Sequence, residues 1–241
     1  DKGVARIERS FGPFGSLGEH YSGEQGEPVV DERGVHEVRK TYDAHGNTID
    51  ERYLGVDGMP ANIREHGVPH IRWIYDRRGN WVSVSYLDAD GKRTTQRSTG
   101  IAEIRRVFDA ADNVVLESYL DVTGQPTFNR TTGAAGLKRG RDRLGRETER
   151  TFLDVTGAPT AHKEWGVAAV RYDYDAFGAT VSESYSDVAS KNAIRLDDGF
   201  WKIAYERDAA GVETARRFFG PDGNAALTTD WGIARIDYVR D

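Results

Sequence analysis

The sequence predicts an all-β protein made of tandem 33-residue β-hairpin repeats, stacked into an elongated, spiralling antiparallel sheet or a solenoid-like array. Three observations predict this class. Matching residue types recur at a fixed period along the chain, turn signals recur about every 9–12 residues, and the apolar residues between turns alternate with polar ones. Alternation with a period of two is typical of half-buried strands.

The period is set most clearly by glycine, which recurs every 33 residues at Gly34, Gly67, Gly100, Gly133, Gly166, Gly199 and Gly232. An aromatic column keeps the same period at Tyr53, Tyr86, Tyr119, Phe152, Tyr185 and Phe218. The repeat units are therefore 34–66, 67–99, 100–132, 133–165, 166–198 and 199–231, with a shortened unit 3–33 before them and a partial unit 232–241 after them. We expect residues 1–241 to form one repeat array, and we expect the natural protein to continue beyond residue 241.

Each unit reads, in order, as strand, turn, strand, turn and a short extended segment. In the unit 67–99, Ile71, Trp73 and Tyr75 would share one face of a first strand, and the residues from Val82 to Tyr86 would form the second. The first turn opens with an aspartate and closes with a glycine, as in the segment 76–79, which suits a type I turn followed by a residue with positive φ. A proline after the second turn favours an edge position, because proline cannot donate to a ladder.

Ankyrin units have the same length, but they need two helices, and no stretch between the turn signals is long enough for a typical helix. One unit of this size would bury too little apolar area to fold alone. We therefore expect the aromatic column to be buried between neighbouring units, with stability spread along the array.

Composition excludes several classes of protein. The 33 basic and 39 acidic residues are mixed along the chain and give a net charge of −6, so we expect no nucleic-acid partner. There is no cysteine and no apolar run of membrane-spanning length, so we expect no disulfide, no cysteine-based metal site and no membrane insertion. The nucleophile, phosphate-loop and zinc-protease motifs are missing, and we expect no enzyme activity, no cofactor and no metal.

Two features could suggest a metal site. His66 and His70 are close in sequence, but on a loop leading into a strand their spacing sets no shared face, so we interpret them as ordinary polar residues. The acidic turn 88–91 offers fewer oxygens than calcium requires, so we interpret Asp88 as a turn-capping residue.

Two sets of side chains are candidates for ligand binding. Tryptophan faces can hold sugar rings or peptides, although they serve equally well as plugs between stacked units. The candidates are Trp73, Trp165, Trp201 and Trp231, of which Trp165 and Trp231 occupy the same column. A basic column lies on the strand face opposite to the apolar column and should point outward, at Arg39, Arg72, Arg105, Lys138 and Arg171, of which Arg39, Arg72 and Arg105 are the binding candidates. It could bind acidic groups or could be a solvated face with local ion pairs.

The first turn resembles the Tyr-Asp-x-x-Gly core of the YD-repeats in Rhs-type bacterial proteins. The matching residues are Tyr42-Asp43 with Gly46, Tyr75-Asp76 with Gly79, and Tyr174-Asp175 with Gly178. Phe108-Asp109 has Asp112 in the glycine position, whereas Arg141-Asp142 and Arg207-Asp208 lack the aromatic residue. The 33-residue unit is longer than the units of that family. The resemblance implies a bacterial repeat protein that is secreted or exposed at the cell surface.

Three functions fit these observations. The first is a non-enzymatic scaffold or protein-interaction module, with self-association through open sheet ends as one form of partnership. The second is a glycan- or cell-wall-binding array in which several weak sites act together. The third, which the resemblance suggests, is a shell segment of a larger toxin-like protein.

Overall fold

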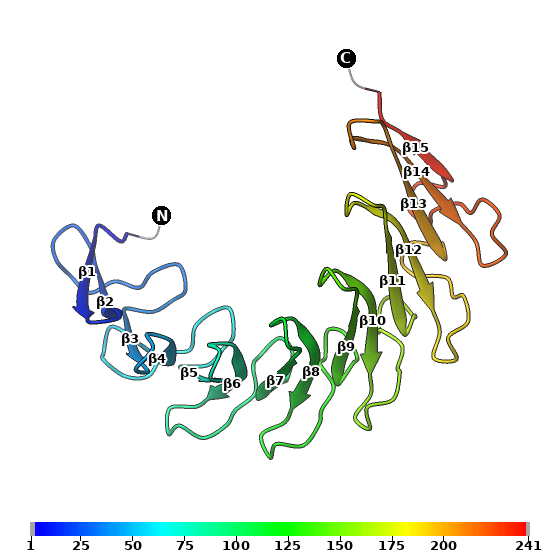
Figure 1. The fold of residues 1–241 in the computed structure, drawn as a ribbon. Helices are drawn as coiled ribbons and strands as arrows, with labels where there is room; N and C mark the ends of the chain where they lie inside the picture. Colours follow the sequence, from blue (N-terminus) through cyan, green and yellow to red (C-terminus); the bar gives the residue numbers. More distant parts are fainter. Residues whose placement is uncertain (1–2, 240–241) are drawn as a thin grey trace. The chain divides into compact units, whose positions relative to one another are not determined.

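The computed structural model describes residues 3–239, and within them it contains strands and loops but no helix. Its fifteen strands are β1 (Arg6–Gly12), β2 (Gly15–Ser22), β3 (Glu37–Tyr42), β4 (Thr48–Leu54), β5 (His70–Tyr75), β6 (Trp81–Leu87), β7 (Glu103–Phe108), β8 (Val114–Leu120), β9 (Gly136–Arg141), β10 (Glu147–Leu153), β11 (Ala169–Tyr174), β12 (Thr180–Ser186), β13 (Lys202–Arg207), β14 (Glu213–Phe219) and β15 (Arg235–Asp237). They form one open sheet whose strand order follows the chain (Figure 1). The predicted all-β class is confirmed, and of the two arrangements left open the structure has the antiparallel sheet.

Contacts divide the chain into two compact units. The first holds the residues up to Phe108 together with Glu117–Arg130, and the second holds Asp109–Leu116 and the residues from Thr131 onward. Within each unit, hairpins of two strands follow one another, and a long loop separates each hairpin from the next (Figure 1).

Pairing within a hairpin is longer than pairing between hairpins. Strands β5 and β6 pair from His70↔Leu87 to Tyr75↔Trp81, with a bulge before the turn. Strands β4 and β5, which belong to successive hairpins, pair only from Asp50↔Arg72 to Arg52↔His70. The turn ends of neighbouring hairpins are therefore not joined by ladder hydrogen bonds.

From the second hairpin to the seventh, the turn between the two strands is capped by an aspartate, as the sequence predicts. Asp43 Oδ1 accepts hydrogen bonds from the backbone N–H groups of His45 and Asn47, both at 2.9 Å. Gly46 follows with φ of 87°. Asp112 and Ser190, which replace glycine in two of the turns, adopt the same region with φ of 62° and 61°. Backbone geometry, and not the glycine itself, is thus what the repeat preserves.

The long loops are tied to one another by their backbones. After each hairpin the chain makes a single bridge back to the second strand, as in Leu54↔Pro60, which is the short extended segment predicted from the proline. Further along, one amide donates to a carbonyl of the loop one unit earlier. The six bonds are Arg64 to Arg33, Arg97 to His66, Arg130 to Thr99, Lys163 to Thr132, Leu196 to Trp165 and Thr229 to Asp198, at 2.7–3.0 Å.

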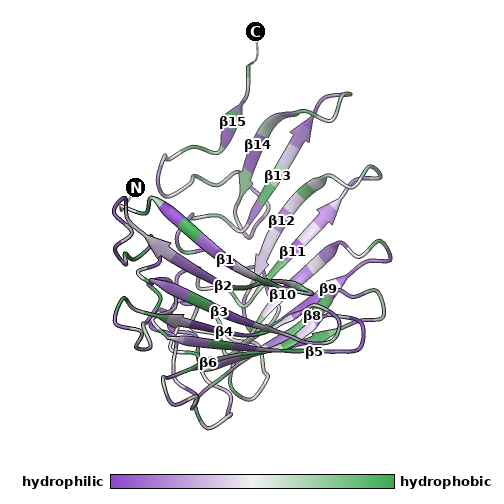
Figure 2. Ribbon diagram, turned by 90° about the vertical axis from the view of Figure 1, so that its left-hand side faces the viewer, coloured by the Kyte–Doolittle hydropathy of each residue, from purple (hydrophilic) through white to green (hydrophobic). Residues whose placement is uncertain are grey.

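Apolar columns form a core in each unit. In the first unit the core contains Val38, Tyr53, Val68, Ile71 and Tyr86, all buried. In the second it contains Phe152, Val167, Val170, Tyr185, Phe200, Ile203 and Phe218. Figure 2 shows the hydrophobic residues as short green patches among hydrophilic ones along the strands. The expected burial of the aromatic column is observed, and burial raises the pKa of both Tyr86 and Tyr185 to about 12.

Candidate functional site

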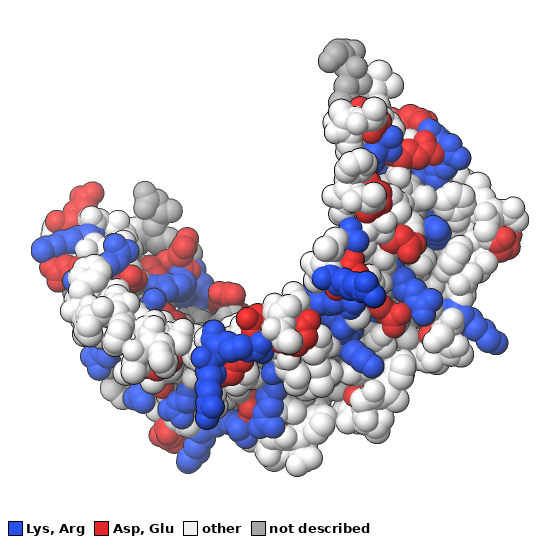
Figure 3. Space-filling view, in the orientation of Figure 1, with Lys and Arg blue, Asp and Glu red and all other residues white. Residues whose placement is uncertain are grey.

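The predicted basic column points outward, and each of its four arginines is paired with a carboxylate. The pairs are Arg39 with Glu37 at 2.5 Å, Arg72 with Asp50 at 3.3 Å, Arg105 with Glu103 at 2.6 Å and Arg171 with Glu149 at 3.0 Å. Basic and acidic side chains are interspersed over the visible surface (Figure 3). The positive charges of these four arginines are thus compensated by local ion pairs. Ligand binding by Arg39, Arg72 and Arg105 stays a prediction.

Two of these carboxylates belong to buried polar clusters. Glu103, with 2% of its surface exposed, contacts Arg93 and Arg105, each at 2.6 Å, and accepts a hydrogen bond from Ser83 Oγ. Asp50 lies 2.6 Å from Nε2 of the buried His70. Burial alone would raise the pKa of Asp50, but the hydrogen bonds from His70 and Arg52 outweigh it, so the pKa is lowered. Both clusters link neighbouring strands.

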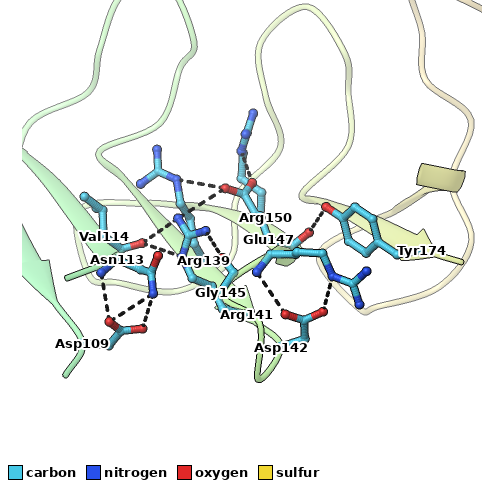
Figure 4. A network of polar contacts seen from close by, with 11 residues as sticks. Asp109, Asn113, Val114, Arg139, Arg141, Asp142, Gly145, Glu147, Arg150 and Tyr174 are labelled. Carbon is cyan, nitrogen blue, oxygen red and sulfur yellow. Dashed lines mark hydrogen bonds and ion pairs between the residues drawn. The ribbon is translucent and has the colours of Figure 1, made fainter. Parts of the chain in front are cut away.

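A second polar network lies among hairpins of the second unit (Figure 4). The Glu147 carboxylate contacts Arg139 at 3.4 Å and Arg150 at 2.7 Å, while its backbone carbonyl accepts a 2.7 Å hydrogen bond from Tyr174 Oη. The guanidinium of Arg141 donates to the carbonyl of Val114 at 3.3 Å. The network therefore joins consecutive hairpins near their turn ends.

Tyr174 and Arg141 occupy equivalent positions, and the structure shows that they have the same role. Each donates to a carbonyl 27 residues earlier, as does Arg207, whose Nη2 lies 2.9 Å from the carbonyl of Thr180. Tyr42 makes the corresponding bond to Ser16 at 2.8 Å. At the sequence level, Arg141 and Arg207 were exceptions to the Tyr-Asp pattern. The signal that unites all four residues is a long side chain with a terminal hydrogen-bond donor.

The four candidate tryptophans lie in different environments. One face of Trp165 stacks on His162 with 4.3 Å between ring centroids, and the guanidinium of Arg195 lies 4.5 Å from the Trp165 centroid. Trp73 is half-buried against the core of the first unit, and Trp201 is also half-buried. Trp231 is 72% exposed and lines a cavity of about 250 Å³ with Tyr185, Tyr205 and Phe218.

Trp165 and Trp231 share a sequence column but differ in how far neighbouring residues cover their rings. Arg195 and Leu196, which cover Trp165 and its neighbour Gly166, come from the following loop. Around Gly232, the neighbour of Trp231, no described residue other than the two chain neighbours comes within 4 Å of a built Cβ. The two rings are therefore not equivalent platforms in this structure. Their role in ligand binding stays a prediction.

The two sequence features that could suggest a metal site have other contacts. His66 Nδ1 lies 2.6 Å from Gln96 Nε2, whereas His70 contacts Asp50. Asp88 Oδ1 accepts hydrogen bonds from the amides of Asp90 and Lys92, which is the predicted turn-capping role. Within residues 3–239, no three acidic or histidine side chains gather in an arrangement that could hold a metal ion. The same residues include no helix long and apolar enough to cross a membrane.

Comparison with known proteins gives a fold-level likeness only. No family model matches the sequence, and no curated protein matches it. Among solved structures, the chain is similar to the crystal structure of TcdB2-TccC3, with a TM-score of 0.43, 12% identity and 91% of this chain covered. It is also similar to the Photorhabdus luminescens Tc holotoxin pore, with a TM-score of 0.39, 12% identity and 96% of this chain covered. In both cases the match spans 12% of the length of the other chain.

Proposed function

We propose that this chain is a repeat scaffold, built from hairpins with a shared backbone frame, whose exposed residues take part in protein association. The observation that carries the proposal is the set of backbone hydrogen bonds between successive loops. These bonds do not depend on side-chain identity, because donors and acceptors come from the backbone of residues as different as Arg64 and Leu196. The frame can therefore stay constant while exposed side chains vary.

One exposed column illustrates this variation. In the first unit it contains Ile74 and Val107, which are 56% and 52% exposed, and in the second it contains the exposed Asp173 and the half-buried Glu206. Exposed apolar residues that adjoin one another on a surface can mark a site that binds other proteins. A protein partner or self-association fits this arrangement, and we propose an extracellular or cell-surface location for it. A segment of the shell of a larger toxin-like protein is the more specific version of this proposal.

Inserting a second copy of residues 166–198 directly after Asp198 tests the scaffold. The insertion preserves every column, so the longer chain should fold, keep its strand content by circular dichroism and show a larger radius of gyration by X-ray scattering. A collapsed or aggregated product would contradict a modular frame. The shell version is tested separately by reading the gene around this segment, and absence of any enzyme-like segment in the same reading frame would contradict it.

A further inference from the structure

The gap between the second and third hairpins departs from the repeat. These hairpins are β3–β4 and β5–β6, and their pairing ends at Asp50↔Arg72. A cleft of about 460 Å³ lies beyond that point, within the range of about 300–1,000 Å³ typical of small-molecule sites. A smaller hollow of about 170 Å³ shares His45, Asp76 and Arg77 with it.

At four other positions of this column the gap is closed by a side chain, whereas Phe108, at a fifth, has no hydrogen-bond donor. Tyr174, Arg141 and Arg207 each donate to a carbonyl 27 residues earlier, and Tyr42 does so across a slightly shortened unit. Tyr75 occupies the equivalent position, and its corresponding acceptor would be the carbonyl of Thr48. Among the residues that the structure describes, however, Tyr75 Oη makes no hydrogen bond. Tyr75 is half-buried, and this burial raises the pKa of its phenol.

The cleft combines aromatic, aliphatic and polar side chains. Its lining residues are Asp43, His45, Ile49, Asp50, Arg72, Trp73, Ile74, Tyr75, Asp76 and Arg77. The aromatic rings of Trp73 and Tyr75 therefore lie beside both hydrogen-bond donors and hydrogen-bond acceptors. Three carboxylates face two guanidinium groups and one imidazole, so the cleft has no large excess of either charge.

The carboxylates are already engaged, but several donors are not. Asp43 and Asp76 each cap a turn, and Asp50 is held by His70, Arg52 and Arg72. In contrast, no hydrogen bond or ion pair forms within residues 3–239 from the side chains of His45 and Arg77, nor from the hydroxyl of Tyr75. A ligand that enters the cleft would meet aromatic surface, free donors and carboxylate oxygens with remaining lone pairs.

We propose that this cleft binds a neutral sugar ring of a glycan. A pyranose has an apolar face that can lie on an aromatic ring, and its hydroxyl groups both donate and accept hydrogen bonds. The three carboxylates oppose an acidic sugar, and the near balance of charge gives no attraction for a polyanion. This inference goes beyond the scaffold proposal. The two are tested separately, since inserting a repeat unit tests the frame without changing the cleft.

The test uses the whole chain and three tetrasaccharide probes, namely cellotetraose and chitotetraose, which are neutral, and tetragalacturonate, which is acidic. Binding is measured by titration calorimetry at millimolar ligand. We expect saturable binding of at least one neutral probe and at least tenfold weaker binding of the acidic one. Absence of binding by both neutral probes, or tighter binding of tetragalacturonate, would overturn the proposal.

The repeat itself supplies the decisive variant. In Y75R, an arginine should close the gap as Arg141 and Arg207 close theirs, so the variant should stay folded and lose the neutral glycan. Y75F removes only the hydroxyl and should weaken binding about tenfold, the effect of one hydrogen bond. The matched control, Y174F, removes a tyrosine hydroxyl that already has a partner and should leave binding unchanged. Binding that survives in folded Y75R would place the glycan elsewhere and overturn the proposal.

Discussion

At the scale of single residues, the turns explain which positions the repeat preserves. An aspartate accepts two backbone N–H groups, and a residue with positive φ follows it, as in Asp154 and Gly157. The sequence predicts both roles, because aspartate and glycine have distinct turn chemistry. It does not predict that Ser190 would keep the left-handed conformation, because the neighbouring strands impose it.

Replacing Ser190 by glycine should stabilise the protein. Ser190 has φ of 61°, where a residue with a Cβ costs about 1–2 kcal/mol, and the greater freedom of glycine in the unfolded chain offsets part of the gain. We expect S190G to raise the free energy of unfolding by about 0.5–1 kcal/mol in urea titrations. The matched control is G157A in the same column, where φ is 85° and space is open, and it should destabilise by about 1–2 kcal/mol. Equal stability of wild type and both variants would refute this account of the turns.

At the scale of elements, hairpins and loops are joined by two kinds of contact. The sequence predicts the hairpins well, because alternation and turn chemistry are local signals. It does not predict the joining contacts, since these link residues about one unit apart. Gly67, in the repeat glycine column, is an example of such a contact. A Cβ on Gly67 would lie 2.8 Å from Arg97 Cβ in the next loop. Glycine is therefore needed there for close packing as well as for its φ of 71°.

Two alanine variants separate conformational cost from packing cost. G79A lies in an open turn with φ of 86°, so it should cost about 1–2 kcal/mol through backbone strain alone. G67A carries a similar strain and also forces the next loop away, which should add about 1–3 kcal/mol. Chemical denaturation of both variants measures the difference. A G67A variant no less stable than G79A would contradict close packing between loops.

Hairpin-to-hairpin ties are tested by removing one hydroxyl. Tyr174 Oη donates to the carbonyl of Glu147 at 2.7 Å, so Y174F should lower the free energy of unfolding by about 0.5–1.5 kcal/mol. Y174R should recover most of this loss, because arginine makes the equivalent bond at Arg141 and Arg207. Urea titrations of the three proteins compare them. If Y174R proves as destabilising as Y174F, tyrosine and arginine do not share the same role at this position.

At the scale of the whole molecule, the period, the turn signals and the alternation together predicted the class of fold, whereas the candidate site was harder to predict. Trp165 and Trp231 share a sequence column, yet one is covered by Arg195 and the other is exposed. The cover of Trp165 comes from Arg195 in the following loop, and a column of identical letters does not report such a contact. The sequence did not predict the cleft at Tyr75 for the same reason. The cleft lies where Tyr75 does not make the hydrogen bond to the previous hairpin that equivalent side chains make.

Acid should weaken the entire array. The pKa values of many turn aspartates are lowered, chiefly by hydrogen bonds to side-chain and backbone donors in their own turns, as in Asp43, Asp109, Asp121, Asp154 and Asp222. Because these pKa values are lowered in the folded state, the ionised aspartates stabilise the protein above the ordinary aspartate pKa of about 3.9. This stabilisation is lost as the pH falls below that value. Urea titrations at pH 7 and pH 3 should therefore show lower stability at pH 3. Stability that does not fall would contradict the capping role of the carboxylates.

The central claim is that a constant frame is repeated along the chain, and deletion of one unit tests it most directly. Removing residues 166–198 joins Trp165 to Gly199 and keeps every column in register. Removing only residues 166–181 shortens the chain out of register and serves as the control. Urea unfolding of the first variant should stay cooperative, with a smaller m-value that reflects the smaller buried surface, whereas the control should lose its strand signal in circular dichroism. A whole-unit deletion that unfolds the protein as thoroughly as the control would contradict the repeat-scaffold account.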